Sequence, residues 1–130
     1  MAFITSRINY LKASAKKLRP FAQALKGKKI DEAEWIIKNS GLGHAPEFWH
    51  ALTNALAMAK SKGETVADAS VAQIAICDGP RLKRFRPVAR GRSAGYRHSL
   101  SHLTLTIQTD ATITAKKPRP SRNIKEQNGS

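Results

Sequence analysis

The chain has 130 residues, a hydrophobic fraction of 41% and a formal net charge of +14 at pH 7. This length suits one small folded domain with extensions, and so large a positive charge indicates a polyanionic partner such as nucleic acid or an anionic membrane surface. The single cysteine excludes an intramolecular disulfide framework and a Cys-based zinc finger, and the lack of an apolar signal core or of eighteen consecutive apolar residues predicts a soluble intracellular protein.

The first thirty residues predict a strand followed by a helix. Residues 3–11 are rich in β-branched and aromatic types. Because alternate residues of a strand share a face, Ile4, Ile8 and Tyr10 would lie on the same face. Ser14 is expected to cap a helix that continues to about Leu25. Pro20 lies inside this helix, so we expect a kink or an irregular first turn.

A second, shorter helix is predicted up to about Asn39. Asp31 and Glu34 have the spacing of a capping box, and Ile30 with Trp35 has the spacing of a hydrophobic staple. This pattern places Trp35 on the apolar side of the helix, where a core position is the main expectation and a ligand-stacking position the alternative.

The third predicted helix is the longest. Pro46 suits its first turn and Gly63 its end, and apolar residues recur at helical spacing from Phe48 to Ala59. Trp49 belongs to this apolar stripe, so it too is expected in the core.

Two strands are predicted after the helices. Residues 71–77 are almost wholly apolar, which predicts a central strand covered on both faces with Cys77 buried. Residues 103–107 alternate strictly between apolar and polar types, which is typical of a half-buried strand. The order of elements predicts an α+β fold in which three helices pack on one face of a small antiparallel sheet.

The segment between these two strands carries seven cations and no acid between Gly79 and His98. A connection of this length, with strands at both ends, predicts a long protruding β-hairpin over residues 79–101. Arginine suits phosphate because its planar fork donates parallel hydrogen bonds, and interleaved aromatic rings can stack on unpaired bases. The alternative is a solvated basic loop with no specific partner.

Charge is segregated along the chain, since residues 30–78 hold seven of the nine acids while residues 1–29 hold eight cations and no acid. The candidate RNA-contacting residues of the hairpin are Arg81, Lys83, Arg84, Phe85, Arg86, Arg90, Gly91, Arg92, Tyr96 and Arg97. The candidates on the remainder of the fold, which we call the body, are Lys12, Lys16, Lys17, Arg19, Lys26, Lys28, Lys29 and His102. An ordinary solvated helix face is the alternative for the cations of the first helix.

Catalysis and metal binding find little support in the sequence. His98 and His102 would lie on one face of a strand but about 13 Å apart, at about 3.3 Å per residue. Asp78 has no carboxylate neighbour in sequence for paired acid–base or two-metal chemistry. We therefore expect no enzyme activity, no metal and no cofactor, and a phosphodiesterase using these three residues ranks far behind RNA binding.

Residues 1–110 are expected to form a single domain that includes the hairpin. Residues 111–130 contain five cations, two prolines and one glutamate, and end in polar residues. This composition is typical of a disordered basic tail.

Three segments resemble the large-subunit ribosomal protein twenty-two family. They are Asp-Gly-Pro-Arg-Leu-Lys-Arg at 78–84, Arg-Pro-Val-Ala-Arg-Gly-Arg at 86–92 and Ser-His-Leu-Thr at 101–104. The family pattern has Glu-Gly-Pro, Lys-Arg, Pro-x-Ala-Lys/Arg-Gly-Arg and Ser-His-Ile-Thr in the same order. The resemblance extends upstream over roughly residues 5–109, whereas His98 and Ser99 stand where the family usually has a basic pair.

The resemblance implies a structural, non-enzymatic constituent of the large ribosomal subunit, in a cytoplasmic or an organellar ribosome. In that family the body binds large-subunit rRNA early in assembly and the hairpin tip lines the nascent-peptide exit tunnel. The implied partners are large-subunit rRNA, neighbouring ribosomal proteins and the nascent polypeptide, with no membrane and no self-association. A basic nucleic-acid-binding or regulatory protein acting outside the ribosome is the alternative.

Overall fold

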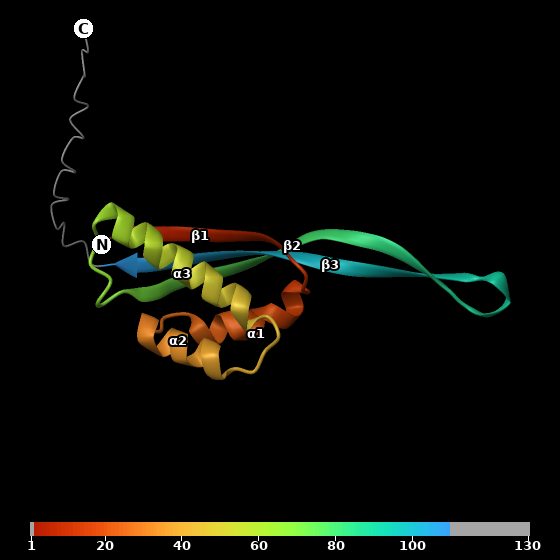
Figure 1. The fold of residues 1–130 in the computed structure, drawn as a ribbon, viewed down its shortest axis with the longest axis horizontal. Helices are drawn as coiled ribbons and strands as arrows, with labels where there is room; N and C mark the ends of the chain where they lie inside the picture. The colour runs from red at the N-terminus through yellow and green to blue at the C-terminus, as the bar shows by residue number, and fades with distance from the viewer. Residues whose placement is uncertain (1, 110–130) are drawn as a thin grey trace, which may run out of the picture.

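The computed structural model describes residues 2–109, which form three helices and a three-stranded antiparallel sheet (Figure 1). The expected tail at 111–130 lies outside the described residues. In chain order the elements are β1 (Ala2–Leu11), α1 (Ala15–Leu25), α2 (Ile30–Asn39), α3 (Ala45–Lys62), β2 (Ser70–Pro87) and β3 (Ser93–Thr109). A short 3₁₀ turn at Ala89–Gly91 joins β2 to β3. Across residues 2–109, no helix has the length and apolar character needed to cross a membrane.

The sheet has the order β1-β3-β2, with both neighbours antiparallel to the central strand β3. All three helices lie on one face of this sheet, as Figure 1 shows, and the long hairpin formed by β2 and β3 extends away from them. The predicted α+β architecture is therefore confirmed.

The core forms where β3 meets the helices. Leu103, Leu105 and Ile107 are buried, and the intervening residues are half-buried, so the predicted period of two is confirmed. On the helix side, Phe48 of α3 is fully buried and meets Phe21 of α1 edge-to-face with ring centroids 4.7 Å apart. These contacts fix the helical layer against the strand from which the hairpin projects.

The prediction that residues 71–77 form a central strand covered on both faces is wrong. The segment belongs to β2, which is an edge strand because β3 occupies the centre of the sheet. Ile74 and Ile76 pack against the core on the helix side, but the alternate residues face the open side. Part of the outer edge of β2 is covered by the chain between α1 and α2, since the Gly27 N–H donates to the Val71 carbonyl over 2.8 Å.

Cys77 is consequently exposed rather than buried. An accessible thiol can react as its thiolate, whereas a buried one is protected. We expect Cys77 to react with a disulfide reagent such as dithionitrobenzoate in the native protein at nearly the rate found in denaturant. Stoichiometric labelling without denaturant checks this, and a thiol that reacts only after unfolding would contradict the open-sided edge strand.

The predicted first strand is confirmed, but its last residues do not keep the predicted phase. A register irregularity between Ile8 and Leu11 interrupts the pairing of β1 with β3. Tyr10 has a positive φ of 59° and is 63% exposed, while Leu11 is buried in its place. A bulge adds a residue to one strand and so exchanges the faces beyond it, which makes the prediction for Tyr10 wrong.

Helix α1 begins after Ser14 as predicted, and it runs as one helix through Pro20. The Ser14 side chain makes no capping hydrogen bond; its carbonyl accepts instead from the Lys17 N–H over 3.0 Å. This three-residue spacing gives the first turn a 3₁₀-type bond, in keeping with the irregular first turn expected there.

Helix α2 starts two residues earlier than predicted by the capping-box pattern, which makes Asp31 the N-cap. Lys29 is its N-cap, and no side chain caps it. Trp35 is 67% exposed, so both the staple and the core position predicted for it are wrong. Helix α3 matches its prediction, with Pro46 in its first turn, a left-handed Gly63 at its end and Trp49 partly buried against the core.

Candidate nucleic-acid interface

The hairpin is a two-stranded ribbon that continues after the third strand has ended. Pairing of β1 with β3 stops at Leu11 opposite Ser101, but pairing of β2 with β3 continues to Pro87 opposite Ser93. From Asp78 to the turn the ribbon is about 30 Å long, at about 3.3 Å per residue. Every residue from Arg81 to His98 is exposed, so the ribbon adds nothing to the core and presents all its side chains to a partner.

The tip of the hairpin is a tight turn around Arg90 and Gly91, which both adopt left-handed backbone conformations with φ of 60° and 68°. The Val88 N–H donates to the Arg92 carbonyl over 2.9 Å and closes the turn. Glycine adopts this conformation without steric cost, whereas arginine does so at a small one. The turn therefore places Arg90 at the end of the hairpin, and Arg92 follows at the residue whose carbonyl closes the turn.

The root of the hairpin is fixed to the body at several points. A register irregularity between Asp78 and Arg81 contains Gly79, where a Cβ atom would lie 3.0 Å from the Leu100 carbonyl oxygen. A Cβ at this distance would be in tighter contact than Cβ atoms normally make, so glycine suits the close approach of the two strands. On the helix side, Arg19 of α1 lies 3.7 Å from the Asp78 carboxylate. Lys12 shares a hollow beside the root with Leu82, His98, Ser99 and Leu100.

The register divides the hairpin's side chains between two faces. Directly opposed residues share a face, and residues two apart on one strand do also. One face carries Arg81, Lys83, Phe85 and Arg97; the other carries Leu82, Arg84, Arg86, Tyr96 and His98. Both faces are cationic, and Lys83 stands directly opposite Arg97, a like-charge pair that is unfavourable without an anion between them.

Tyr96 is held by its neighbours on the second face. The Arg86 guanidinium lies 5.4 Å from the centroid of the Tyr96 ring, and the His98 ring meets it edge-on at 5.1 Å. This cation–π contact favours the rotamer of Arg86 in which its guanidinium lies over the Tyr96 ring. His98, which replaces a basic residue of the family pattern, takes part in this contact.

The candidate cations of the body are all exposed and lie on or near α1. Arg19 and Lys26 line one hollow, together with Ile74 and Ile76 at the edge of β2. Lys28 is partly neutralised by Glu32, 3.6 Å away within α2. The structure thus brings Lys12 and Arg19 to the hairpin root, while Lys16, Lys17 and Lys29 extend the basic surface over α1 and the connection to α2.

His102 is half-buried on the open side of the sheet. Its Nδ1 accepts a hydrogen bond of 3.1 Å from the Tyr10 N–H, and the two rings meet edge-to-face at 5.0 Å. Tyr10 is an exposed aromatic residue that the sequence pattern placed on the same face of the strand as Ile4 and Ile8. Nothing in the sequence marks the bulge that turns it outward.

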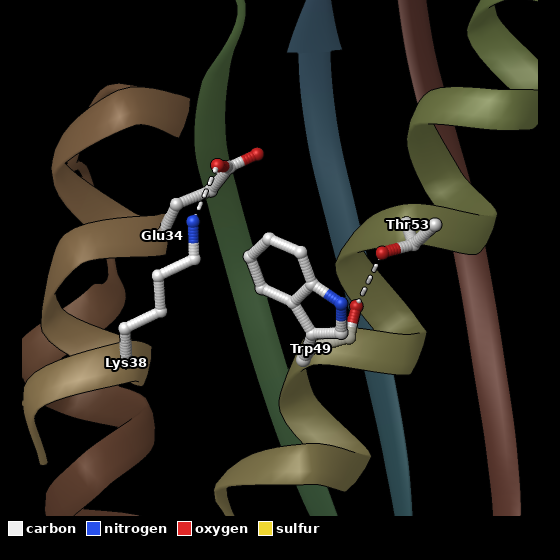
Figure 2. Close-up of polar contacts among 4 residues, drawn as sticks. All are labelled: Glu34, Lys38, Trp49 and Thr53. Atoms are coloured by element: carbon white, nitrogen blue, oxygen red, sulfur yellow. Dashed lines mark hydrogen bonds and ion pairs between the residues drawn. The ribbon is translucent and has the colours of Figure 1, made fainter.

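The acid-rich part of the body, residues 30–78, also has contacts of its own. Figure 2 shows Lys38 of α2 between the Glu34 carboxylate, 3.8 Å away, and the ring of Trp49 on α3, whose centroid is 4.8 Å away. The Thr53 hydroxyl donates to the Trp49 carbonyl over 2.9 Å. Lys38, one of three cations among residues 30–78, is therefore already paired, and most of the positive charge of the described residues lies on the hairpin and in residues 1–29.

The residues weighed for catalysis do not form a reactive group. Asp78 faces Arg19, His98 contacts Tyr96 and His102 contacts Tyr10, each at a different place. Within residues 2–109, no three His, Cys, Asp or Glu side chains cluster in a way that could hold a metal ion.

Comparison with known proteins agrees with the fold and the charge distribution. The family model described as ribosomal protein L22p/L17e matches residues 6–108. A protein of Syntrophotalea carbinolica named large ribosomal subunit protein uL22 is 33% identical over 105 residues, covering 78% of this chain and 94% of that protein. Proteins of the same name from Syntrophomonas wolfei and Desulfosudis oleivorans are 35% and 30% identical, covering 76% and 85% of this chain and 88% and 97% of theirs. The chain belongs to the L22p/L17e family of ribosomal proteins.

Proposed function

We propose that this protein is a structural, non-enzymatic constituent of the large ribosomal subunit and that it binds large-subunit rRNA through its hairpin. The observation that carries the proposal is the ribbon itself: seven exposed cations and no acid on a two-stranded extension anchored in a folded body. Relatives named for the large subunit, matched over most of their length, support the same assignment.

The proposed mechanism is electrostatic. Exposed arginines on both faces of the ribbon would bind phosphates of RNA segments on either side of it and relieve their mutual repulsion. The body residues on α1 and at the root would form a second phosphate-binding surface, with residues 1–110 acting as one domain. By the family resemblance, the turn around Arg90 and Gly91 would line the nascent-peptide exit tunnel and contact the passing polypeptide.

Sedimentation of a tagged chain in its native cells tests the proposal. We expect the tagged chain to migrate in sucrose gradients with large subunits, whole ribosomes and polysomes, and to shift to the free large-subunit fraction when subunits are dissociated at low magnesium. Recovery only from the slowly sedimenting fractions, or with free small subunits, would contradict a large-subunit role. The first of these outcomes would favour the alternative of a nucleic-acid binder outside the ribosome.

A further inference from the structure

A shallow hollow of about 250 Å³ lies on the shaft of the hairpin, between its root and its tip. It is lined by Lys83, Arg84, Phe85, Gly95, Tyr96 and Arg97. This stretch of regular pairing carries an exposed aromatic ring, Phe85, between cations. The arrangement around Phe85 indicates what the hollow can bind.

The Phe85 ring lies against the backbone of Gly95. The two residues are directly paired in the β2–β3 ladder, and a Cβ atom at position 95 would lie 3.8 Å from Phe85 Cε1 and 4.0 Å from Cδ1. The ring edge therefore lies at van der Waals distance from the place where a Cβ at position 95 would stand, so the ring packs beside the glycine. Phe85 is nevertheless 73% exposed, so the other side of the ring is open to solvent. A ring supported on one side and open on the other is a platform for stacking a flat group.

Two cations flank this platform on the same face. Lys83 and Arg97 are directly paired, and each lies two residues from Phe85 or Gly95 along its own strand. Directly opposed Cβ atoms in such a ladder are about 5 Å apart, and like charges in these positions repel each other. A phosphate between them would remove the repulsion and accept hydrogen bonds from both. The face thus offers a stacking surface and an anion site within the reach of one nucleotide.

We propose that this hollow binds one unpaired nucleotide of RNA, with its base stacked on the open side of Phe85 and its phosphate held by Lys83 and Arg97. The proposal rests on the proposed function and specifies one part of it. The base must be unpaired, because a base inside a helix is already covered on both sides by its neighbours. Tyr96 also borders the hollow, but its direct pairing with Arg84 places its side chain on the opposite face, where Arg86 and His98 engage its ring.

Binding of the full chain to short oligonucleotides tests the stacking contact. The probes are a fluorescently labelled RNA of twelve adenosines and a matched RNA in which the three central bases are replaced by abasic sites. Loss of one base–aromatic stack weakens single-strand binding by about 5- to 150-fold, and leucine retains part of the apolar contact. For Phe85→Leu we therefore expect about tenfold weaker binding to the intact oligonucleotide and an unchanged dependence on salt. The preference of the parent chain for the intact over the abasic probe should disappear.

Matched variants separate the ring from its surroundings. Phe85→Tyr keeps a ring and should bind as the parent does. Gly95→Val adds a branched side chain beside the ring, at a backbone position without positive φ. Its Cβ would be at van der Waals distance from the ring edge, so the methyl groups beyond it should displace the ring and weaken binding as Phe85→Leu does. Trp35→Leu removes an exposed aromatic ring of the body, on α2, and should leave the preference for the intact probe unchanged. All these positions are exposed, so thermal unfolding should match the parent's.

Variants that remove charge show whether a negative result contradicts only the stacking contact or RNA binding by the hairpin as a whole. Replacing Lys83 and Arg97 together by glutamine should reduce the slope of log affinity against log salt by about 0.7, because the two cations share one phosphate contact. That reduction, combined with unchanged binding of Phe85→Leu and Gly95→Val, would overturn the stacking proposal while RNA binding by the hairpin stands. A loss seen with Tyr96→Leu and not with Phe85→Leu would overturn it as well. No effect from any of these changes would count against the hairpin as the RNA-binding element too.

Discussion

Replacing residues 83–97 by an Asn-Gly turn should leave a folded body that binds large-subunit rRNA far more weakly. The replacement joins Leu82 to His98, which are directly paired, so a two-residue turn fits the ladder at that point. It removes six cations: Lys83, Arg84, Arg86, Arg90, Arg92 and Arg97. If each contacts one phosphate, the salt slope falls by about 4 and the affinity at 0.15 M salt by about 10³-fold. Filter binding to transcribed rRNA at several salt concentrations measures both quantities.

Two controls identify the cause of that loss. A full-length hairpin with the same six residues changed to glutamine keeps the ribbon's shape and should lose nearly as much affinity and slope. Three glutamines at Lys16, Lys17 and Lys26 should reduce the slope by only about 2. An unchanged slope after removal of the hairpin would contradict its assignment as a main phosphate-binding element, because the body's cations would then account for all the binding.

The hairpin was the most predictable part of the structure, because an acid-free run between two apolar segments leaves few alternatives. A run of like charges cannot enter a core, and strands at both ends hold it outside. Its extent and faces were less predictable, since they depend on a ladder that continues from Arg81 to Pro87 through residues with no apolar pattern. The division into two faces, and the pairing of Phe85 with Gly95, required the register. The RNA contacts of the individual residues stay a prediction.

The errors in the fold share a physical origin. An apolar run predicts that a strand is buried, but it does not show whether one face or both are covered. In the structure β3 is the central strand and β2 an edge strand, so alternate residues around Ile74 lie on the face of the sheet opposite the helices. Local patterns also misplaced Trp35. A capping box describes a helix start in isolation. The segment before α2 pairs with β2 through a bridge between Lys29 and Ser70, and the helix starts two residues earlier than the box predicted. Tertiary contacts decided both outcomes, and neither is visible in a short window of sequence.

The open side of the sheet follows from the same arrangement. Only one face is covered by helices, which leaves Tyr10, Cys77 and the half-buried His102 on a surface that continues into the hairpin. A sheet normally buries an apolar face by packing it against another layer of secondary structure, and no such layer covers this side within residues 2–109 (Figure 1). In a ribosomal protein that role can fall to RNA, and the polar threonines along β3 on this side suit a wet interface rather than a dry one.

Substituting Phe48 by alanine should destabilise the body more than any change on the hairpin. Phe48 is fully buried and packs edge-to-face on Phe21, so truncation removes both its buried area and this contact, at a cost of about 3–5 kcal/mol. For a domain of this size each kcal/mol lowers the midpoint of thermal unfolding by about 4–8 °C, which predicts a fall of about 15–30 °C by calorimetry or circular dichroism.

Trp35→Ala is the matched control, because it removes a larger ring from the same helical layer. That ring is 67% exposed, so its loss should change the free energy of unfolding by no more than about 0.5 kcal/mol. A larger effect from Trp35 than from Phe48 would contradict the helix packing described here. Below its lowered midpoint, the Phe48→Ala protein should keep the parent's salt slope in rRNA binding, since every hairpin cation lies outside the core that the substitution weakens. Stability and RNA binding would then be separable, with the helices and β3 responsible for the first and the ribbon for the second.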